Sequence, residues 1–396
     1  MFKKVKLSDL GDIYTGNTPS KNNKDFYNSN DIMFIKPDTL SYNIKNIENS
    51  NEYISEKARE KARIIPKNSL LVSCIGNIGK LGINNEPVAF NQQINAIVHN
   101  NKIESSKYLA YVLKFNQKKL QSIANAPVVP IINKNDFSKF EVYIHDDLNI
   151  QKRIVDILDK AMVLIQKRQE EIRYLDYLIK SKFIEMFGEP ISNPKKWNVV
   201  KLGKISSVGS SKRVFIDELV NEGIPFYRGT EIGALSTGKN VEPTLFITKE
   251  HYEKLKNITG VPTIGDLLMP SICPDGRIWS VDTKKPFYFK DGRVLWIHLE
   301  SLAIKSMFLK YMLCEKFNRE YNKIASGTTF AELKIFVLKD LDIIMPPIEL
   351  QNEFVDFVKE TDKLKFEMEK SLKELENNFN SLMQRAFNGE LFNEEQ

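Results

Sequence analysis

The chain has 396 residues and a mass of 45.7 kDa, which is enough for two or three domains. Its 42% hydrophobic and 27% charged residues exclude an intrinsically disordered protein, and no stretch approaches 18 uninterrupted apolar residues, so we expect no membrane span. The net charge of +6 permits an anionic partner such as nucleic acid without requiring one.

The three cysteines, Cys74, Cys273 and Cys314, lie far apart and form no CxxC spacing. This pattern argues against a disulfide scaffold or a zinc site and favours a reducing compartment. The lysines near the N-terminus are not followed by an apolar segment, so we expect no secretory signal. We therefore expect a cytoplasmic protein.

Residues 1–150 form the first predicted region. Short β-rich runs, IMFIK, SLLVSCI and INAIV, alternate with turn-rich segments and a few helical ones, which is typical of a mixed α/β domain. Ser55 precedes a charged, helix-forming stretch, as an N-cap residue would.

Residues 151–190 predict a long helix. Its apolar positions alternate in steps of four and three residues, which is typical of a helix packed along its length against another helix. The pattern ends at Gly188, where we expect the helix to stop. The seam consists of Ile154, Leu158, Ile165, Ile172, Leu175 and Ile179.

Residues 191–347 repeat the first region. VKL at Val5–Leu7 returns at Val200–Leu202, DIMFIKPDT around Lys36 is echoed by GIPFYRGTE around Arg228, and Thr248 stands where Ser55 stood. IANAPVVP near Ile123 matches IASGTTFA near Ile324. The repeat predicts a second domain of the same architecture.

Residues 348–396 predict the second long helix, at an offset of about 200 residues from the first and ending at Gly389. The alternative is two unconnected amphipathic helices, each packed on its own domain. The seam consists of Phe354, Val358, Met368, Leu372, Leu375, Phe379 and Leu382.

Together these elements predict an α+β chain: two mixed α/β domains joined by two long antiparallel coiled-coil helices, with an internal pseudo-two-fold repeat. DNA readers use two-fold symmetry to place two modules in successive major grooves. Because the two copies differ in sequence, the half-sites that they read should differ, and the helices would set a gap of fixed length between them.

Motifs for catalysis are missing. The four histidines are scattered, and the chain has no Walker motif, no GxGxxG and no GxSxG. One alternative is a self-sufficient Mg²⁺-dependent nuclease that uses Pro274-Asp275, Glu332 and Lys334. A second alternative is a cytosolic coiled-coil scaffold that binds only proteins.

Over its whole length, the chain resembles the specificity (S) subunit of type I restriction–modification systems. The resemblance rests on the repeated pattern GNIGKLGI…NQQ and IASGTTF…LKDLDIIMPPIELQ and on the helical tails. The family usually has prolines and Glu-Gln before each helix. Here Leu350 replaces the Glu before Gln351, and Gln151 follows Ile150 without prolines. These departures concern only the junctions between domain and helix.

The resemblance implies two target-recognition domains, 1–150 and 191–347, a central helical spacer, 151–190, and a C-terminal helical spacer, 348–396. It implies a non-catalytic subunit that binds double-stranded DNA, two modification (methyltransferase) subunits and two restriction subunits. The complex would direct adenine-N6 methylation and restriction to a bipartite, gapped, asymmetric target. The partners would use S-adenosylmethionine, ATP and Mg²⁺, and this chain would bind no cofactor or metal.

Base reading requires amide or basic side chains near loop tips, because these supply the donors and acceptors that match base edges. Lys36 and Arg228 follow equivalent strands, and the other candidates lie in Gly-rich loops, in an amide run and after a Gly-Ser-Ser turn. Each could instead be an ordinary surface residue. The remaining candidates are Asn77, Lys80, Asn91, Gln92, Gln93, Lys212, Arg213, Arg277 and Trp279.

Overall fold

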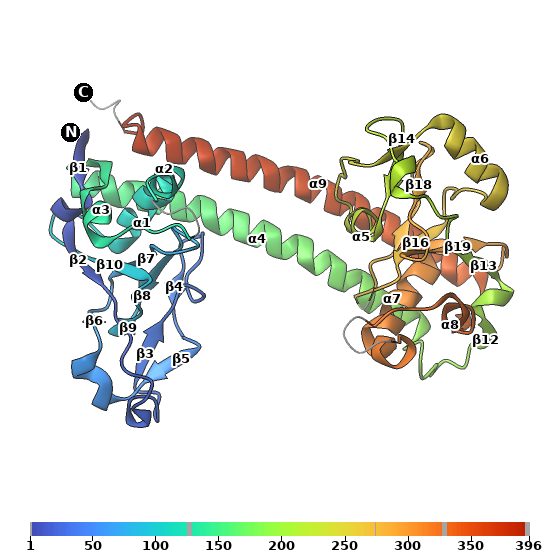
Figure 1. The fold of residues 1–396 in the computed structure, drawn as a ribbon, viewed down its shortest axis with the longest axis horizontal. Helices are drawn as coiled ribbons and strands as arrows, with labels where there is room; N and C mark the ends of the chain where they lie inside the picture. Colours follow the sequence, from blue (N-terminus) through green and yellow to red (C-terminus); the bar gives the residue numbers. More distant parts are fainter. Residues whose placement is uncertain (1, 125–128, 274, 327–330, 393–396) are drawn as a thin grey trace. The chain divides into compact units, whose positions relative to one another are not determined.

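The computed structural model describes residues 2–124, 129–273, 275–326 and 331–392. It divides into two compact units: Met1–Glu170 with Glu369–Gln396, and Glu171–Met368. The two long helices each contribute to both units (Figure 1). Parts of the repeated segments IANAPVVP and IASGTTFA, together with Pro274 of the nuclease alternative, lie outside the described residues.

The described residues of the first unit form three sheets. They are a five-stranded sheet of order β2-β10-β7-β8-β4, a four-stranded sheet of order β5-β3-β9-β6 and the pair β1-β11. The strands are β1 (Phe2–Lys6), β2 (Gly11–Thr15), β3 (Ile32–Ile35), β4 (Asn46–Ile47), β5 (Glu52–Ile54), β6 (Ile64–Ile65), β7 (Leu70–Ser73), β8 (Leu81–Asn84), β9 (Val88–Phe90), β10 (Ile94–His99) and β11 (Glu141–His145). The helices of this region are α1 (Ser106–Phe115), α2 (Gln117–Ser122) and α3 (Lys134–Lys139).

The second unit repeats this arrangement with fewer strands. Its sheets have the orders β13-β19-β16-β17, β15-β14-β18 and β12-β20. The strands are β12 (Asn198–Lys201), β13 (Ser206–Gly209), β14 (Ile224–Tyr227), β15 (Phe246–Ile247), β16 (Leu267–Pro270), β17 (Trp279–Ser280), β18 (Tyr288–Phe289), β19 (Val294–Leu299) and β20 (Asp342–Met345). The helices of this region are α5 (Gly229–Leu235), α6 (Lys249–Thr259), α7 (Ser306–Ile324) and α8 (Ile335–Lys339).

The strand orders confirm the internal repeat that the sequence predicts. The order β2-β10-β7-β8 corresponds to β13-β19-β16-β17, and β5-β3-β9 corresponds to β15-β14-β18. The register agrees residue by residue, because Ile35 pairs with Phe90 in the parallel pair β3-β9 as Tyr227 pairs with Phe289 in β14-β18. Corresponding positions of the two units can therefore be compared directly.

The long helices α4 (Leu148–Phe187) and α9 (Ile348–Phe387) pack antiparallel, as predicted. In the first unit, the beginning of α4 shares a core with the end of α9, as Leu158 does with Phe379. In the second unit, the end of α4 meets the beginning of α9, and the ring centroids of Phe183 and Phe354 lie 5.4 Å apart. Burial of these apolar faces stabilises the helices, because isolated helices are marginal in water.

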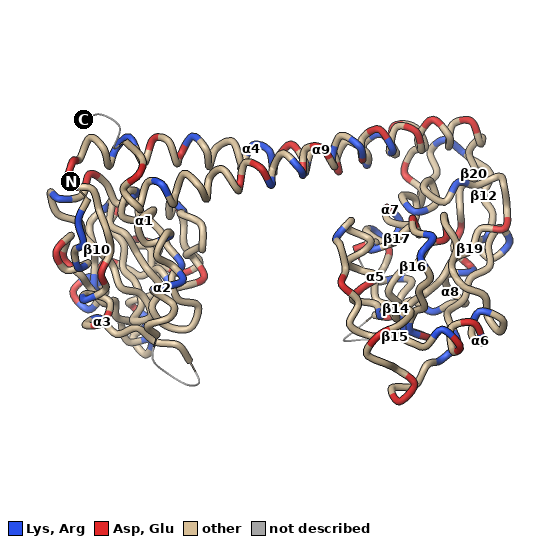
Figure 2. Tube along the Cα trace, turned by 90° about the horizontal axis from the view of Figure 1, so that it is seen from above, with Lys and Arg blue, Asp and Glu red and all other residues tan. Residues whose placement is uncertain are grey.

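The predicted seam positions differ in burial. The residues Ile154, Leu158, Ile165, Leu175, Ile179, Phe354, Val358 and Phe379 are buried. The residues Ile172, Met368, Leu372, Leu375 and Leu382 are partly exposed. Acidic and basic residues recur along both helices (Figure 2). Pairs such as Lys182–Glu185 and Lys359–Asp356 are spaced three residues apart on the helix.

Both long helices end where the sequence predicts. Gly188 and Gly389 follow the last helical turns with positive φ angles of 78° and 77°, a conformation that glycine adopts without a steric penalty. None of the helices in the described part of the chain combines the length and apolar character needed to cross a membrane.

Only one of the two predicted N-caps forms. Thr248 Oγ1 accepts a hydrogen bond of 3.1 Å from the His251 N–H and caps α6. Ser55 donates instead to the Asp25 carbonyl and precedes a short 3₁₀ helix, Glu56–Lys61. The long-range bond to Asp25 takes the place of the local cap.

Candidate nucleic-acid interface

The ends of two parallel strands bring candidate residues together in each unit. In the first unit, the Asn91 N–H donates to the Ile35 carbonyl at 3.1 Å, so that Asn91 lies beside Lys36. In the second unit, the Lys290 N–H donates to the Tyr227 carbonyl at 2.9 Å, so that Lys290 lies beside Arg228. The same backbone geometry therefore presents side chains of different chemistry.

We name these groups by their residues. The first strand-end cluster consists of Lys36, Asn91, Gln92 and Gln93, and the second strand-end cluster consists of Arg228, Lys290 and Arg293. Gln93 and Arg293 also correspond, because their carbonyls accept equivalent hydrogen bonds from Cys74 and Ser271 at 2.8 and 2.9 Å.

The first strand-end cluster is rich in amides. Asn91 is buried, and its Nδ2 donates to Gln93 Oε1 at 2.9 Å. Gln92 is exposed, and its Oε1 accepts from Thr18 Oγ1 at 2.8 Å. Lys36 forms an ion pair with Glu52. Gln92 therefore presents its amide to solvent, while Asn91 serves to orient Gln93.

The second strand-end cluster is cationic. Arg228 Nε and Nη2 donate to the two carboxylate oxygens of Glu231 at 3.1 and 2.7 Å, and Arg293 is largely exposed. Lys290 is exposed and forms no ion pair within the described part of the chain. The three cations line a hollow of about 320 Å³ with Gly229, Thr230, Pro270, Ser271 and Ile272. Such a hollow suits phosphate or the acceptor edge of guanine.

The Arg228–Glu231 pair is held in its charged form. Burial by itself would raise the pKa of Glu231, but hydrogen bonds from Arg228 and Thr230 outweigh it and lower the pKa to about 2. The carboxylate in turn raises the pKa of Arg228. Arg228 is thus oriented at the end of β14 by two bonds, as a bidentate reader requires.

The Gly-rich loops lie next to these clusters. Gly76 and Gly276 have positive φ angles of 73° and 67°, and Asn77 and Arg277 follow them at the same position of the turn. Asn77 is exposed, whereas Arg277 Nε donates to Asp275 at 2.8 Å. Lys80 is half-buried, with its ammonium 5.8 Å from the centroid of the Tyr42 ring.

Trp279 lies elsewhere than expected. The sequence placed it in a loop, but it begins β17, is 5% exposed and packs against Tyr227 and Phe287. Because its indole fills the apolar core of this region, it presents almost no surface to a ligand.

Lys212 and Arg213 lie beside the second strand-end cluster. The Ser211 hydroxyl donates to the Phe289 carbonyl at 2.6 Å, and the Lys212 N–H donates to the Tyr288 hydroxyl at 2.9 Å. Both basic side chains are exposed, and the Arg213 guanidinium lies 5.0 Å from the centroid of the Phe215 ring.

The residues of the nuclease alternative are engaged with cations. Glu332 accepts from Lys334 Nζ at 2.6 Å and from the Ser271 hydroxyl at 3.0 Å. Asp275 is paired with Arg277. Across the described ranges, no group of three or more His, Cys, Asp or Glu residues is placed to hold a metal ion.

The sequence reasoning missed Lys290 and Arg293. The signal is the match of FNQQI at Phe90–Ile94 with FKDGRV at Phe289–Val294, which differ by one inserted residue. The first copy contains three amides, which predict base reading, whereas the second copy contains no amide and offers only the cations Lys290 and Arg293.

The chain matches known proteins along most of its length. The family described as type I restriction modification DNA specificity domain matches residues 1–174 and 194–377. The MjaIX specificity subunit of Methanocaldococcus jannaschii is 26% identical over 383 residues, covering 89% of this chain and 85% of the relative. The HindI specificity subunit of Haemophilus influenzae is 34% identical over 178 residues, covering 43% of this chain and 38% of the relative.

Solved structures show the same fold. A chain from a structure of the type I R-M system has a TM-score of 0.64 and 16% identity, with 98% of both chains covered. The type I S subunit from M. genitalium has a TM-score of 0.53 and 15% identity, with 98% of this chain and 96% of that chain covered. Since the family match covers both copies of the repeat, the chain belongs to the type I restriction modification DNA specificity family.

Proposed function

We propose that the chain is the non-catalytic specificity subunit of a type I restriction–modification complex and reads a bipartite, asymmetric DNA target. One observation carries the proposal: equivalent strand ends present amides in the first unit and cations in the second. Amides pair best with adenine, and arginine pairs best with guanine. Two units of one fold would therefore recognise unlike half-sites.

The proposed contacts fall into two classes. The first class contacts base edges or the adjacent sugar–phosphate and consists of Gln92, Gln93, Arg228, Arg293 and Asn77. The exposed cations beside the clusters, including Lys212, Arg213 and Lys290, are proposed to bind phosphate, which orients a protein on DNA without reading its sequence. Four further candidates are proposed to stabilise the loops that carry these contacts: Lys36, Lys80, Asn91 and Arg277. The buried Trp279 is left out of the set.

We retain the proposed division into recognition domains 1–150 and 191–347 and helical spacers 151–190 and 348–396. Each long helix has 40 residues, which corresponds to about 60 Å at 1.5 Å per residue. In the proposed complex, these helices fix the gap between the half-sites.

The proposed partners are two modification subunits, which methylate adenine N6 with S-adenosylmethionine, and two restriction subunits, which use ATP and Mg²⁺. Tyr174, Tyr177 and Leu178 of α4 support a protein partner, because they lie on one helical face and are 59%, 56% and 48% exposed. The complex is proposed to act in the cytoplasm, where its DNA lies.

Methylation mapping tests the proposal. DNA from cells that express this chain with its modification subunit is compared, by sequencing of N6-methyladenine, with DNA from cells that lack only this chain. We expect a new methylated motif with two unlike halves and a fixed gap. Replacement of residues 1–150 by those of another specificity subunit should change one half only.

The control is the same modification subunit with a different specificity subunit, which shows that the methyltransferase is active. Absence of chain-dependent methylation in that setting would contradict the proposal. If the chain instead binds a protein in the absence of duplex DNA, and salt does not weaken that binding, the scaffold alternative is favoured. Binding to DNA would weaken steeply with salt, because it depends on phosphate contacts.

A further inference from the structure

A buried carboxylate in the second unit orients two aromatic side chains. Asp266 is 3% exposed, and its Oδ2 accepts from Trp296 Nε1 and from the Thr263 N–H, both at 2.8 Å. Its Oδ1 lies 2.7 Å from His298 Nδ1. Burying a carboxylate is costly unless it is fully hydrogen-bonded, as this one is. The network fixes the positions of both rings.

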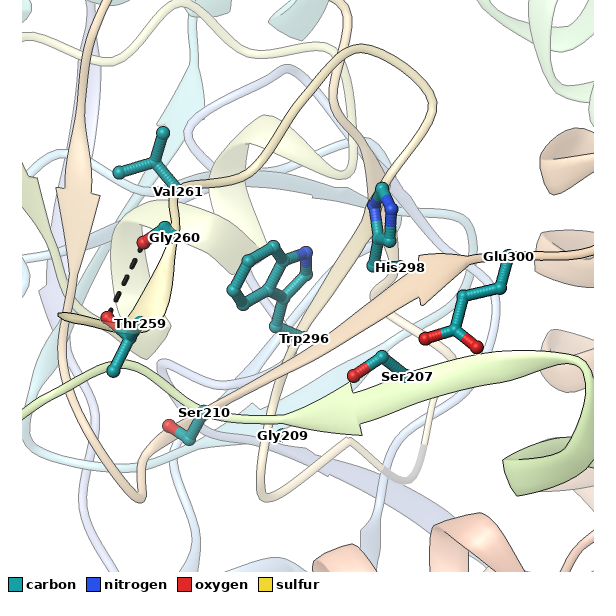
Figure 3. A pocket seen from close by; sticks show the side chains of 9 residues that line it. All are labelled: Ser207, Gly209, Ser210, Thr259, Gly260, Val261, Trp296, His298 and Glu300. Atoms are coloured by element: carbon teal, nitrogen blue, oxygen red, sulfur yellow. Dashed lines mark hydrogen bonds between the residues drawn. The ribbon is translucent and has the colours of Figure 1, made fainter. Parts of the chain in front are cut away.

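The two rings face a cavity. Trp296 and His298 lie two residues apart on β19, so both point to the same side of the sheet, and they line a cavity of about 480 Å³ (Figure 3). Ser207 and Ser210 also line it, as do Thr259 and Gly260 at the end of α6. Ligand cavities of small molecules have volumes of roughly 300–1,000 Å³.

The first unit builds the same sheet without this network. Ala96 pairs with Leu71 as Trp296 pairs with Leu268, so Ala96 and Val98 correspond to Trp296 and His298. Ser69 precedes β7 where Asp266 precedes β16. The fold therefore does not require the buried Asp, the Trp or the His.

The cavity adjoins the second strand-end cluster. The Ser210 hydroxyl lines the cavity, donates to the Val294 carbonyl at 2.7 Å and accepts from the Gly292 N–H at 2.9 Å. Gly292 lies between Lys290 and Arg293 in the chain. A nucleic-acid backbone that is held by these cations would therefore pass next to the mouth of the cavity.

We infer that this cavity captures an unstacked nucleobase of the DNA that the second unit binds, an inference that rests on the proposed function. The Trp296 ring offers a flat face for stacking, which is how proteins hold bases outside a duplex. The bond from Nδ1–H to Asp266 leaves His298 Nε2 available for a contact with the base, and the exposed Glu300 carboxylate supplies acceptors. The carboxylate acceptors favour a base with an exocyclic amino group over thymine, which has none.

The test is a coupling experiment between protein and DNA. The complex with its modification subunit is bound to duplexes that contain the target found by methylation mapping, and an abasic site is moved one position at a time through the second unit's half-site and its flanks. We expect the abasic site to weaken binding roughly 5- to 150-fold at one position, where an amino-bearing base is lost. In a Trp296→Leu complex, the same abasic site should have no further effect.

The controls separate folding and function from base capture. His298→Ala, which alters an exposed side chain, should weaken binding to the intact duplex and reduce the same coupling even if Trp296→Leu fails to fold. Abasic sites in the first unit's half-site should show no coupling to Trp296, because that unit has Ala96 in its place.

The outcomes are distinguishable. Equal abasic effects in the wild-type and variant complexes at every position would overturn the base-capture inference and leave the proposed function standing. Failure of the wild-type complex to prefer the mapped target over an unrelated duplex would overturn the proposed function itself, and the inference with it.

Discussion

At the scale of single residues, Gln151 and Gln351 perform the same structural task in the two units. Gln151 Nε2 donates to the carbonyls of Lys102 and His145 at 2.9 and 2.7 Å, and its Oε1 accepts from the Glu104 N–H at 2.8 Å. Gln351 repeats the pattern with Ala303, Pro346 and Lys305. Each glutamine joins the first turn of a long helix to the preceding loops.

Replacing Gln151 by Leu should therefore destabilise the first unit by about 1–3 kcal/mol, because the buried His145 carbonyl and two partly buried backbone groups lose their partner. Thermal unfolding of the full chain, followed by calorimetry, measures the change. Gln169→Leu on the exposed face of the same helix is the matched control and should change stability by no more than about 0.5 kcal/mol. Equal effects of the two substitutions would contradict the assigned role.

The Arg228–Glu231 pair predicts a dependence on pH. The folded-state pKa of Glu231 is about 2, below its ordinary value of 4.5, so the carboxylate stabilises the fold above about pH 4.5. That contribution is lost as the pH falls from about 4.5 toward 2. Glu231→Gln should cost about 1–3 kcal/mol at pH 7, since hydrogen bonds to a charged group are lost.

Denaturant unfolding between pH 7 and pH 3 checks this prediction. The difference between wild type and Glu231→Gln should shrink as the pH falls below about 4.5. The exposed residue Glu222, in the loop before β14, provides the control substitution Glu222→Gln. A difference that stays constant down to pH 3 would refute the assignment.

At the scale of elements, the two long helices show which structural features the apolar periodicity of the sequence can predict. The alternating apolar steps predicted both helices, their ends at Gly188 and Gly389 and their mutual packing, because a helix with an apolar stripe must bury it. The same pattern could not rank the seam positions: Leu158 is fully buried, whereas Ile172 and Met368 are half-buried. Burial there depends on which neighbours the folded units supply.

One helix offers a paired test, since Leu158 and Leu164 of α4 have opposite environments. Leu158 is completely buried and Leu164 is 53% exposed. Leu158→Ala should lower the free energy of unfolding by about 2–5 kcal/mol, because it leaves a cavity in the core of the first unit. Leu164→Ala should change it by less than about 0.5 kcal/mol.

Equilibrium unfolding of the two variants measures both values. Binding of the modification subunit, measured by calorimetry, supplies the second readout: Leu164→Ala should weaken it if α4 is a docking surface. A loss of stability in Leu164→Ala as large as that in Leu158→Ala would contradict the environments described.

At the scale of the whole molecule, the proposed function divides recognition between two versions of one architecture. Arg293 in the second unit and Gln93 in the first occupy corresponding positions. A net charge of +6 on the chain is modest, so we expect DNA binding to depend on locally concentrated cations rather than on the overall field. The second strand-end cluster is such a concentration.

Arg293→Gln should therefore weaken binding to the mapped target and reduce the slope of log affinity against log salt by up to about one, while relaxing specificity in one half-site only. Mobility-shift titrations between 50 and 200 mM salt, on duplexes mutated in either half, measure both effects. Gln93→Arg is the reciprocal change and should alter the other half-site. Effects of Arg293→Gln spread equally over both halves would exclude the division of labour.

The sequence by itself determined the features that depend on internal repeats and on periodic apolar positions. These features are the two copies, the two helices and their ends, and the mixed α/β character. These follow from local periodicity and from self-similarity, which need no knowledge of distant contacts. Only the tertiary structure decided which polar residues meet. The parallel pairing of β14 with β18 brings Lys290 to Arg228, although 61 residues separate them in the chain.

The tertiary structure also decided which candidates are structural. Trp279 and Asn91 looked like surface residues because they stand next to glycines or amides, but strand pairing buries both. The network of Asp266, Trp296 and His298 gave no local signal, because Asp266 becomes a neighbour of Trp296 and His298 only when β16 pairs with β19. The proposed recognition sites consist of side chains that the sheet register brings together, and register is a property of the folded chain.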